Sequence, residues 1–115
     1  MRAVGFGEFY NGVKGRLTDA QLRLMNGRDY CFESGGTFLA ISIHGNTIWV
    51  AWVVGHGVQY MHELKKAAHA QGYRFIAFIT KADNAAVNAI AKYWKATASR
   101  ARDGIVYKID VKARS

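Results

Sequence analysis

The chain of 115 residues contains no proline and only one cysteine. Without proline, its tight turns must depend on glycine, asparagine and aspartate. Cys31 cannot form a disulfide within the chain, and a single cysteine gives no zinc-binding pattern. We therefore expect Cys31 to be a small buried hydrophobic residue in a protein of a reducing, cytoplasmic setting.

Long hydrophobic runs are also missing. The longest, residues 48–54, has the length of a strand, whereas a membrane span needs about 18 apolar residues. The first residues meet glycine and an acid too early for a signal peptide. Half of the residues are hydrophobic and 13% are aromatic, which is enough for a buried core. These features predict one domain over residues 1–115 with no membrane span.

Acidic residues are scarce. Eight Asp and Glu face sixteen Lys and Arg, and the net charge is +8. Residues 58–115 hold eleven basic and four acidic residues, and so carry +7 of this charge. Such a field attracts nucleic acid or a cofactor with several phosphates. The alternative is a set of solvated basic helix faces, and composition leaves both interpretations open.

The hydrophobic pattern predicts the elements of the fold. Strands are expected at residues 3–6, 29–33, 37–43, 47–54, 74–80 and 105–111. Residues 8–15 are ambiguous, with one or two helical turns. Thr18 and Gln21 form a capping-box pattern for a short helix that ends at Asn26-Gly27. A helix is expected at residues 58–71, and Asp83 is expected to cap another. That last helix carries an apolar stripe that reaches Ala98.

Consecutive strands joined by tight turns pair antiparallel, whereas a strand-helix-strand unit gives a parallel crossover. The order of elements therefore predicts an α/β (α+β) fold with a mixed, mostly antiparallel central sheet and helices on both faces.

A glycine pair lies between the expected strand at residues 47–54 and the helix that follows. The local sequence is Val53-Val54-Gly55-His56-Gly57-Val58. Free N–H groups at a helix N-terminus bind phosphate oxygens, and glycines let the phosphate approach. The same pattern also suits a plain corner between a strand and a helix, and the residues alone leave both interpretations open.

The order of elements and this glycine pair resemble the GNAT (GCN5-related N-acetyltransferase) family, over about residues 18–111. The resemblance implies that acetyl-CoA or another acyl-CoA binds at the glycine pair, through Val53, Val54, Gly55, His56, Gly57 and Val58. The family has Arg or Gln three residues before the first glycine, where this chain has Trp52, and the usual loop is missing.

Residues 88–95, Asn-Ala-Ile-Ala-Lys-Tyr-Trp-Lys, resemble the motif on the last helix of that family. Tyr93 matches the tyrosine that protonates the leaving thiolate of coenzyme A, and a phenol is protonated at neutral pH. The family continues with Gly-Phe where this chain has Thr97-Ala98, so we expect the helix to run on. An ordinary helix tyrosine is the alternative.

If the family chemistry holds, an amine attacks the thioester directly, and backbone N–H groups near residues 52–54 steady its carbonyl oxygen. Four side chains are candidates for the base that deprotonates the amine: Glu33, His44, His56 and Glu63. His62 and His69 are seven residues apart on one expected helix, which is too far to share a metal ion. No metal site is therefore expected.

The short chain also resembles trimmed versions of this fold found in bacteriophages, including virion proteins. That likeness implies a non-catalytic role through protein contacts, in the host cytoplasm or the virion. Aromatic residues that could serve such contacts are Phe9, Tyr10, Trp49, Tyr60 and Trp94. A third interpretation is nucleic-acid binding by cations on or near the last helix, namely Lys92, Lys95, Arg100 and Arg102.

Overall fold

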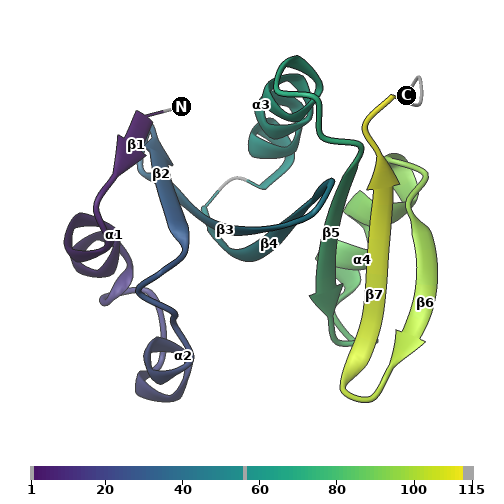
Figure 1. Cartoon of the computed structure of the whole chain (residues 1–115). Helices are drawn as coiled ribbons and strands as arrows, with labels where there is room; N and C mark the ends of the chain where they lie inside the picture. The colour runs from purple at the N-terminus through teal and green to yellow at the C-terminus, as the bar shows by residue number, and fades with distance from the viewer. Residues whose placement is uncertain (1, 56, 113–115) are drawn as a thin grey trace. The chain divides into compact units, whose positions relative to one another are not determined.

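The computed structural model describes residues 2–55 and 57–112. The elements, in chain order, are β1 (Arg2–Val4), α1 (Phe6–Val13), α2 (Asp19–Arg23), β2 (Tyr30–Ser34), β3 (Thr37–His44), β4 (Thr47–Val54), α3 (Gly57–Ala70), β5 (Phe75–Thr80), α4 (Ala85–Tyr93), β6 (Thr97–Ala101) and β7 (Gly104–Asp110) (Figure 1). The strands follow the order β1-β2-β3-β4-β5-β7-β6 in one sheet. Strands β4 and β5 pair parallel, and β1–β2, β2–β3, β5–β7 and β6–β7 pair antiparallel. The expected mixed, mostly antiparallel α/β architecture is confirmed.

The chain divides into two compact units. The first holds the residues up to Ser42 together with Val50–Glu63, and the second holds Ile43–Trp49 together with Leu64 and the residues after it. Strands β3 and β4 and helix α3 each contribute to both units. The single domain expected over residues 1–115 stays a prediction.

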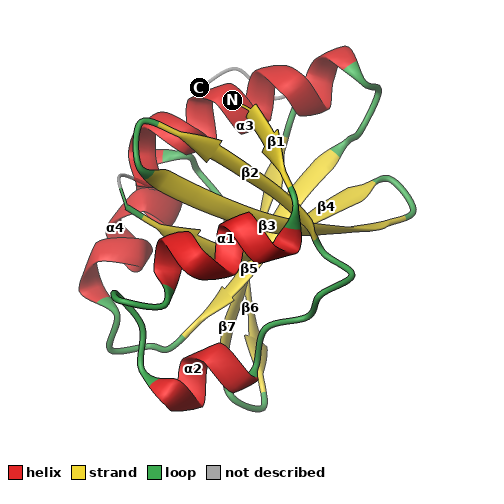
Figure 2. Cartoon of the chain, turned by 90° about the vertical axis from the view of Figure 1, so that its left-hand side faces the viewer, coloured by secondary structure: helices red, strands yellow, loops and turns green. Residues whose placement is uncertain are grey.

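The core of the first unit forms where α1 covers strands β2 and β3 (Figure 2). Phe9 and Val13 lie one helical turn apart on α1, so they share a face, and both are almost fully buried. They pack with Cys31, Ala40 and Val54. Burial of Phe9 and Val13 contributes about 1.5–3 kcal/mol for each side chain. Cys31 is the small buried residue that was expected.

The two short helices of this unit begin differently from each other. α2 has the capping box that the sequence predicts, because Thr18 Oγ1 accepts a bond of 3.2 Å from the N–H of Gln21 and Thr18 N–H donates one of 2.9 Å to Gln21 Oε1. α1 begins at Phe6, so the strand expected at residues 3–6 ends earlier, at Val4, and of the ambiguous residues 8–15 those up to Val13 are helical.

The second unit is built around β5. Its first three residues, Phe75 to Ala77, pair in parallel with Thr47–Trp49 of β4, and all six pair with β7. Ile76 and Ala77 have no exposed surface. Helix α4 lies on one face of β5 and β7, where Tyr107 of β7 donates a hydrogen bond to the side-chain oxygen of Asn88 (Figure 1). This face therefore holds α4 by a polar contact as well as by apolar burial.

The end of α4 differs from the prediction. The helix ends at Tyr93 with Trp94 as its C-cap, instead of continuing to Ala98. Lys95 has a φ of 55°, its N–H donates to the carbonyl of Lys92, and the N–H of Ala96 donates to that of Ala91. This pattern is a Schellman motif, which ends a helix with a left-handed residue. The cap at the other end is Asn84, whose side chain accepts from the N–H of Val87, and the expectation of Asp83 there is wrong.

Residues 97–101, expected to be helical, form β6, which was not predicted. Four of these five side chains are exposed, so neither face of the strand is buried. The sequence Thr-Ala-Ser-Arg-Ala therefore lacks the alternation of apolar and polar residues by which a half-buried strand is predicted. Residues Arg102 and Asp103 form the turn between β6 and β7.

Candidate functional site: the turn from β4 into α3

The candidate site starts where β4 ends and α3 begins. Strand β4 is rich in β-branched and aromatic residues, which favour extended backbone. It ends at the buried Val54, Gly55 follows, and α3 starts at Gly57. A partly buried strand thus leads into a helix of 14 residues.

Gly55 lies against Thr37, the first residue of β3. Its φ is 127°, in the region that side chains rarely adopt. A Cβ atom at this position would lie 2.5 Å from Thr37 Oγ1 and 2.9 Å from Thr37 Cα. Only glycine fits here, for reasons of backbone conformation and of packing. The backbone conformation and the packing against Thr37 therefore explain why residue 55 is glycine, without a bound phosphate, as the interpretation of a plain corner expects.

Tyr60 fixes the same corner from the first turns of α3. Its hydroxyl donates a hydrogen bond of 2.7 Å to the carbonyl oxygen of Thr37, and its side chain is 2% exposed. Burial, with smaller contributions from the charges of Glu33 and Glu63, raises the pKa of Tyr60 to about 12. The sequence predicted Tyr60 only as an aromatic residue for protein contacts. Its role at this corner could not be predicted, because its partner Thr37 lies 23 positions away.

Four other residues predicted to bind the cofactor lie at the end of β4 or at the start of α3. Val53 is partly exposed and Val54 is buried at the end of β4. Gly57 and Val58 form the start of α3, and His56 lies outside the described residues. The first turn of α3 contains no acidic residue. Its backbone N–H groups have no partners within the helix, so this helix start favours an anion.

Glu33, on β2, is one of the four candidate bases. One carboxylate oxygen accepts from the N–H of Gly36 at 3.1 Å, and the other lies 3.1 Å from the guanidinium of Arg2. The bond from Gly36, followed by the Arg2 contact, lowers the pKa of Glu33. A carboxylate held in its charged form is a weaker base, which argues against Glu33 in that role.

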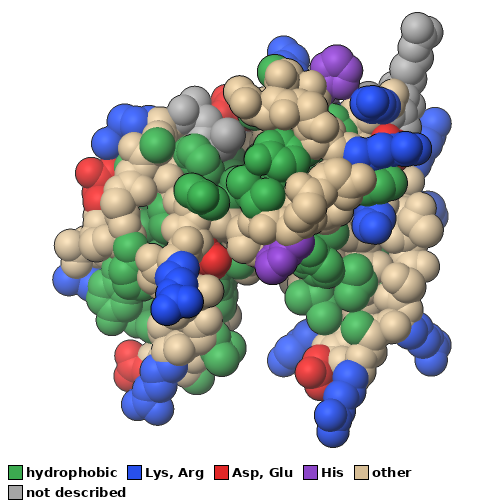
Figure 3. Space-filling view, viewed as in Figure 1, with side chains coloured by type: hydrophobic (Ala, Val, Ile, Leu, Met, Phe, Trp, Pro, Cys, Tyr) green, Lys and Arg blue, Asp and Glu red, His purple; other side chains and the backbone are tan. Residues whose placement is uncertain are grey.

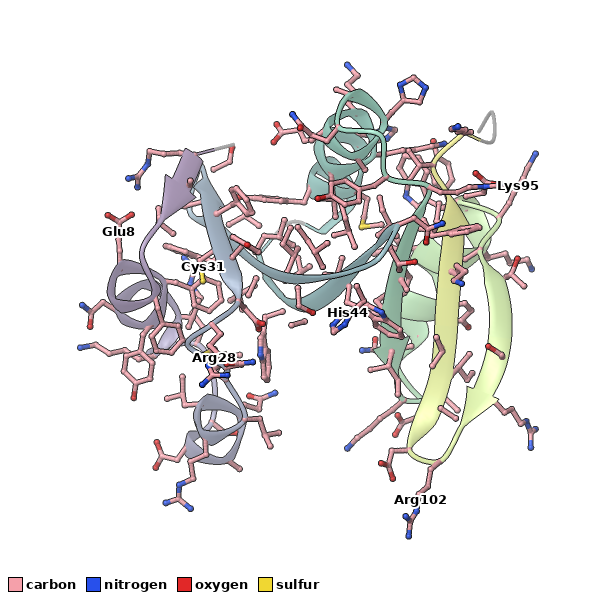
Figure 4. The ribbon with its side chains drawn as sticks, viewed as in Figure 1. Glu8, Arg28, Cys31, His44, Lys95 and Arg102 are labelled. Carbon is pink, nitrogen blue, oxygen red and sulfur yellow. The ribbon has the colours of Figure 1, made fainter. Side chains whose placement is uncertain are left out.

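Two other candidate bases lie on different elements. His44 is the exposed last residue of β3 and belongs to the second unit (Figure 4), and Glu63 is half-buried on α3 in the first. The fourth, His56, lies outside the described residues.

Tyr93 is the last residue of α4 and is 64% exposed. The buried stripe of α4 runs through Ala91 and Trp94, so Tyr93 does not serve the core. Its ring meets that of Trp94 edge to face, with centroids 5.5 Å apart. Tyr93 belongs to the second unit and Gly55 to the first.

The four cations proposed for nucleic-acid binding do not share a helix. Lys92 is on α4, Lys95 follows it, Arg100 is on β6, and Arg102 is in the next turn. Figure 4 shows Lys95 and Arg102 at opposite ends of the β6–β7 hairpin. Lys92 and Lys95 thus lie on or beside α4, as expected, whereas Arg100 and Arg102 lie on and just after β6.

The described residues contain no group of three or more His, Cys, Asp and Glu side chains that could hold a metal ion. Within the same part of the chain, no helix is both long enough and apolar enough to cross a membrane.

Several solved structures are similar to this chain, among them three acyltransferases. The first is the ribosomal-protein-S18-alanine N-acetyltransferase from Escherichia coli, with a TM-score of 0.71 at 12% identity over 98% of this chain and 94% of that enzyme. An N-acetyltransferase from Staphylococcus aureus Mu50 gives 0.56 at 21% identity, over 73% of this chain and 67% of that one. A cAMP-binding acyltransferase from Mycobacterium smegmatis gives 0.59 at 17% identity, over 97% of this chain and 43% of the longer protein.

No family model matches the sequence, and neither does the sequence of any curated protein. At such low identities the shared feature is the arrangement of helices and strands, which agrees with the element order found here. The chain has the GNAT fold of the GCN5-related N-acetyltransferases.

Proposed function

We propose that this protein is a small acyltransferase that moves an acetyl or other acyl group from acyl-CoA to an amine. The turn from β4 into α3 carries the proposal, because it places a helix start without acidic residues next to the end of a strand. The similarity to an N-acetyltransferase over 98% of the chain supports it.

The residues at this turn fit the phosphates of coenzyme A in charge and in chemistry. The backbone N–H groups of Gly57 and Val58, at the start of α3, would hold the phosphate oxygens. Coenzyme A would supply the acyl group as an activated thioester. Thr37 and Tyr60 keep this helix start fixed, because they hold the preceding glycine and the following turn of α3.

Two further parts of the chain would act on the reacting groups. Backbone N–H groups near the end of β4, at Trp52 to Val54, would donate to the thioester carbonyl oxygen. Tyr93 would hold a proton on its hydroxyl and donate it to the departing sulfur. Its large exposed fraction leaves that hydroxyl accessible.

Titration calorimetry with acetyl-CoA, with adenosine diphosphate as a charge control, tests the proposal. We expect micromolar binding that is specific for acetyl-CoA and persists at moderate salt. Gly57→Asp places a negative charge at the first residue of α3 and should weaken binding at least tenfold. Ala85→Asp makes the same change at the first residue of α4 and should leave binding unchanged. Absence of binding, or equal binding of the control nucleotide, would contradict the proposal.

A second proposal is a non-catalytic GNAT-fold protein that works by protein contact, such as a phage virion or host-interaction protein. One observation favours it: contact with Thr37 accounts for Gly55 without any phosphate. The family's Arg or Gln is also replaced by Trp52. The same calorimetry separates the two proposals, since this one expects no specific binding of acetyl-CoA.

A further inference from the structure

The exposed edge of β6 is a surface that the proposed acyltransfer does not use. β6 is the last strand in the sheet order, and it pairs with β7 along its whole length, from Thr97 with Lys108 to Ala101 with Gly104. No strand of the described chain pairs with its other side. In an antiparallel ladder, alternate residues of such an edge strand direct N–H and C=O groups outward, where an extended chain can bind them.

The side chains of β6 leave this edge open. Residues 97–100 are all exposed, and three of them, Thr97, Ala98 and Ser99, are small. A neighbouring strand can therefore approach the backbone closely. β1, at the other end of the strand order, has only three residues, and its Arg2 is held by Glu8 at 2.7 Å and Glu33 at 3.1 Å. Its short length and its ion pairs protect β1 in a way that β6 lacks.

Positive charge follows the edge of β6 from end to end. Lys95 precedes the strand, Arg100 lies on it, and Arg102 follows it, all exposed. Figure 4 shows Lys95 and Arg102 at its two ends, and Figure 3 shows Lys and Arg side chains along this margin of the molecule. Asp103 is the one acidic residue between positions 95 and 105. The backbone thus offers strand pairing, and the side chains favour a negatively charged partner.

We infer that the edge of β6 docks an acidic peptide segment in extended conformation, which adds to the sheet as a strand. A second copy of this chain is a poorer occupant, because each copy carries a net charge of +8. Backbone hydrogen bonds would give the affinity, and Lys95, Arg100 and Arg102 would select acidic side chains. This surface does not depend on acyl-CoA and stands apart from the proposed function.

A dye-labelled peptide of alternating glutamate and valine is the probe, and fluorescence anisotropy measures its binding to the full chain. Arg100→Glu should weaken binding about tenfold, as expected for a charge reversal at a surface contact. Arg100→Lys should keep most of the affinity. Arg28→Glu makes the same change of charge in the loop before β2 and should leave binding unchanged (Figure 4). If Arg100→Glu fails to fold, Arg102→Glu, in the turn between β6 and β7, replaces it as the test variant.

Hydrogen exchange distinguishes strand addition from simple charge attraction. Added peptide should slow exchange of backbone amides in residues 97–101 and leave those of β1 unchanged. A peptide with proline at alternate positions should lose both binding and protection, because proline cannot donate to the ladder. Equal binding of Arg100→Glu, or binding without protection of β6, would overturn the inference. Protection that grows with protein concentration alone would assign the edge to a second copy and would also overturn it.

Discussion

The hydroxyl of Tyr60 donates a hydrogen bond of 2.7 Å to the carbonyl oxygen of Thr37, across 23 positions of the chain. Thr37 also fills the space beside Gly55, so one residue of β3 holds both sides of the turn from β4 into α3. The position of the α3 start therefore depends on contacts to a neighbouring strand as much as on its own sequence. This dependence gives specific expectations for the two residues that meet Thr37.

Gly55→Ala should destabilise the protein by about 2–4 kcal/mol. The new Cβ would lie 2.9 Å from Thr37 Cα, and the φ of 127° is strained for alanine. Gly35→Ala is the matched control: Gly35 also has a positive φ, of 55°, but no atom lies within 4 Å of its Cβ position. Gly35→Ala should lower the free energy of unfolding by only about 1 kcal/mol. Urea unfolding of both variants measures the difference.

A double mutant isolates the contact with Thr37. Thr37→Ala removes Oγ1, the atom nearest to the added Cβ. If the contact with Oγ1 dominates, Gly55→Ala combined with Thr37→Ala should be more stable than the sum of the two single changes predicts. Additive effects would show that Oγ1 contributes little, and would assign the cost to backbone strain and to the contact of 2.9 Å with Thr37 Cα, which alanine keeps.

Tyr60→Phe should change how stability depends on alkaline pH. Because burial raises the folded-state pKa of Tyr60 to about 12, the unfolded chain loses this proton first, near pH 10. The stability that Tyr60 contributes is thus fully present below about pH 10 and falls as pH rises toward 12, by roughly 2–3 kcal/mol in all.

Phenylalanine cannot titrate, so Tyr60→Phe should lose less stability between about pH 9 and pH 11 than the unchanged protein does. At neutral pH the variant should be less stable by about 1 kcal/mol, because the bond to Thr37 is lost. Urea unfolding at several pH values measures both effects. Parallel pH profiles of the two proteins would show that Tyr60 titrates normally in the folded state.

Most of the fold could be predicted from the hydrophobic pattern, since β4 and β5 are rich in apolar residues and the long helix α3 has a clear period. The end of α4 could not. Ala98 continues the helical spacing of the apolar stripe, and neither glycine nor proline marks the stop. The backbone of Lys95 ends the helix instead, and β6 follows as an edge strand with almost no buried side chain.

The candidate site could be predicted only in part, for a similar physical reason. Local sequence showed that a glycine pair precedes a helix, but the choice between a corner and a phosphate site depends on what surrounds Gly55. That neighbour, Thr37, comes from another strand, and a contact between distant positions leaves no local pattern.

Lys95→Gly should stabilise the protein by about 0.5–1 kcal/mol. Lys95 has a φ of 55° at the position where glycine usually ends a helix, and glycine adopts this conformation without steric cost. Lys92→Gly is the control, because Lys92 lies within α4 and glycine there should destabilise by about as much. Thermal unfolding of both variants should thus give shifts of opposite sign. A lower melting temperature for Lys95→Gly would show that its side chain contributes more than the backbone strain costs.

Tyr93→Phe should separate catalysis from binding if the proposed acyltransfer is correct. The variant keeps the ring that meets Trp94 edge to face and loses only the exposed hydroxyl. Loss of a positioned proton donor typically lowers turnover by about 10²–10⁴-fold. Affinity for acetyl-CoA, measured by calorimetry, should stay the same, because the phosphates would bind at the start of α3. Tyr30→Phe removes the hydroxyl of another exposed tyrosine, on β2, and should leave turnover unchanged. Equal turnover of Tyr93→Phe and the unchanged protein would remove Tyr93 from the mechanism and leave the binding proposal intact.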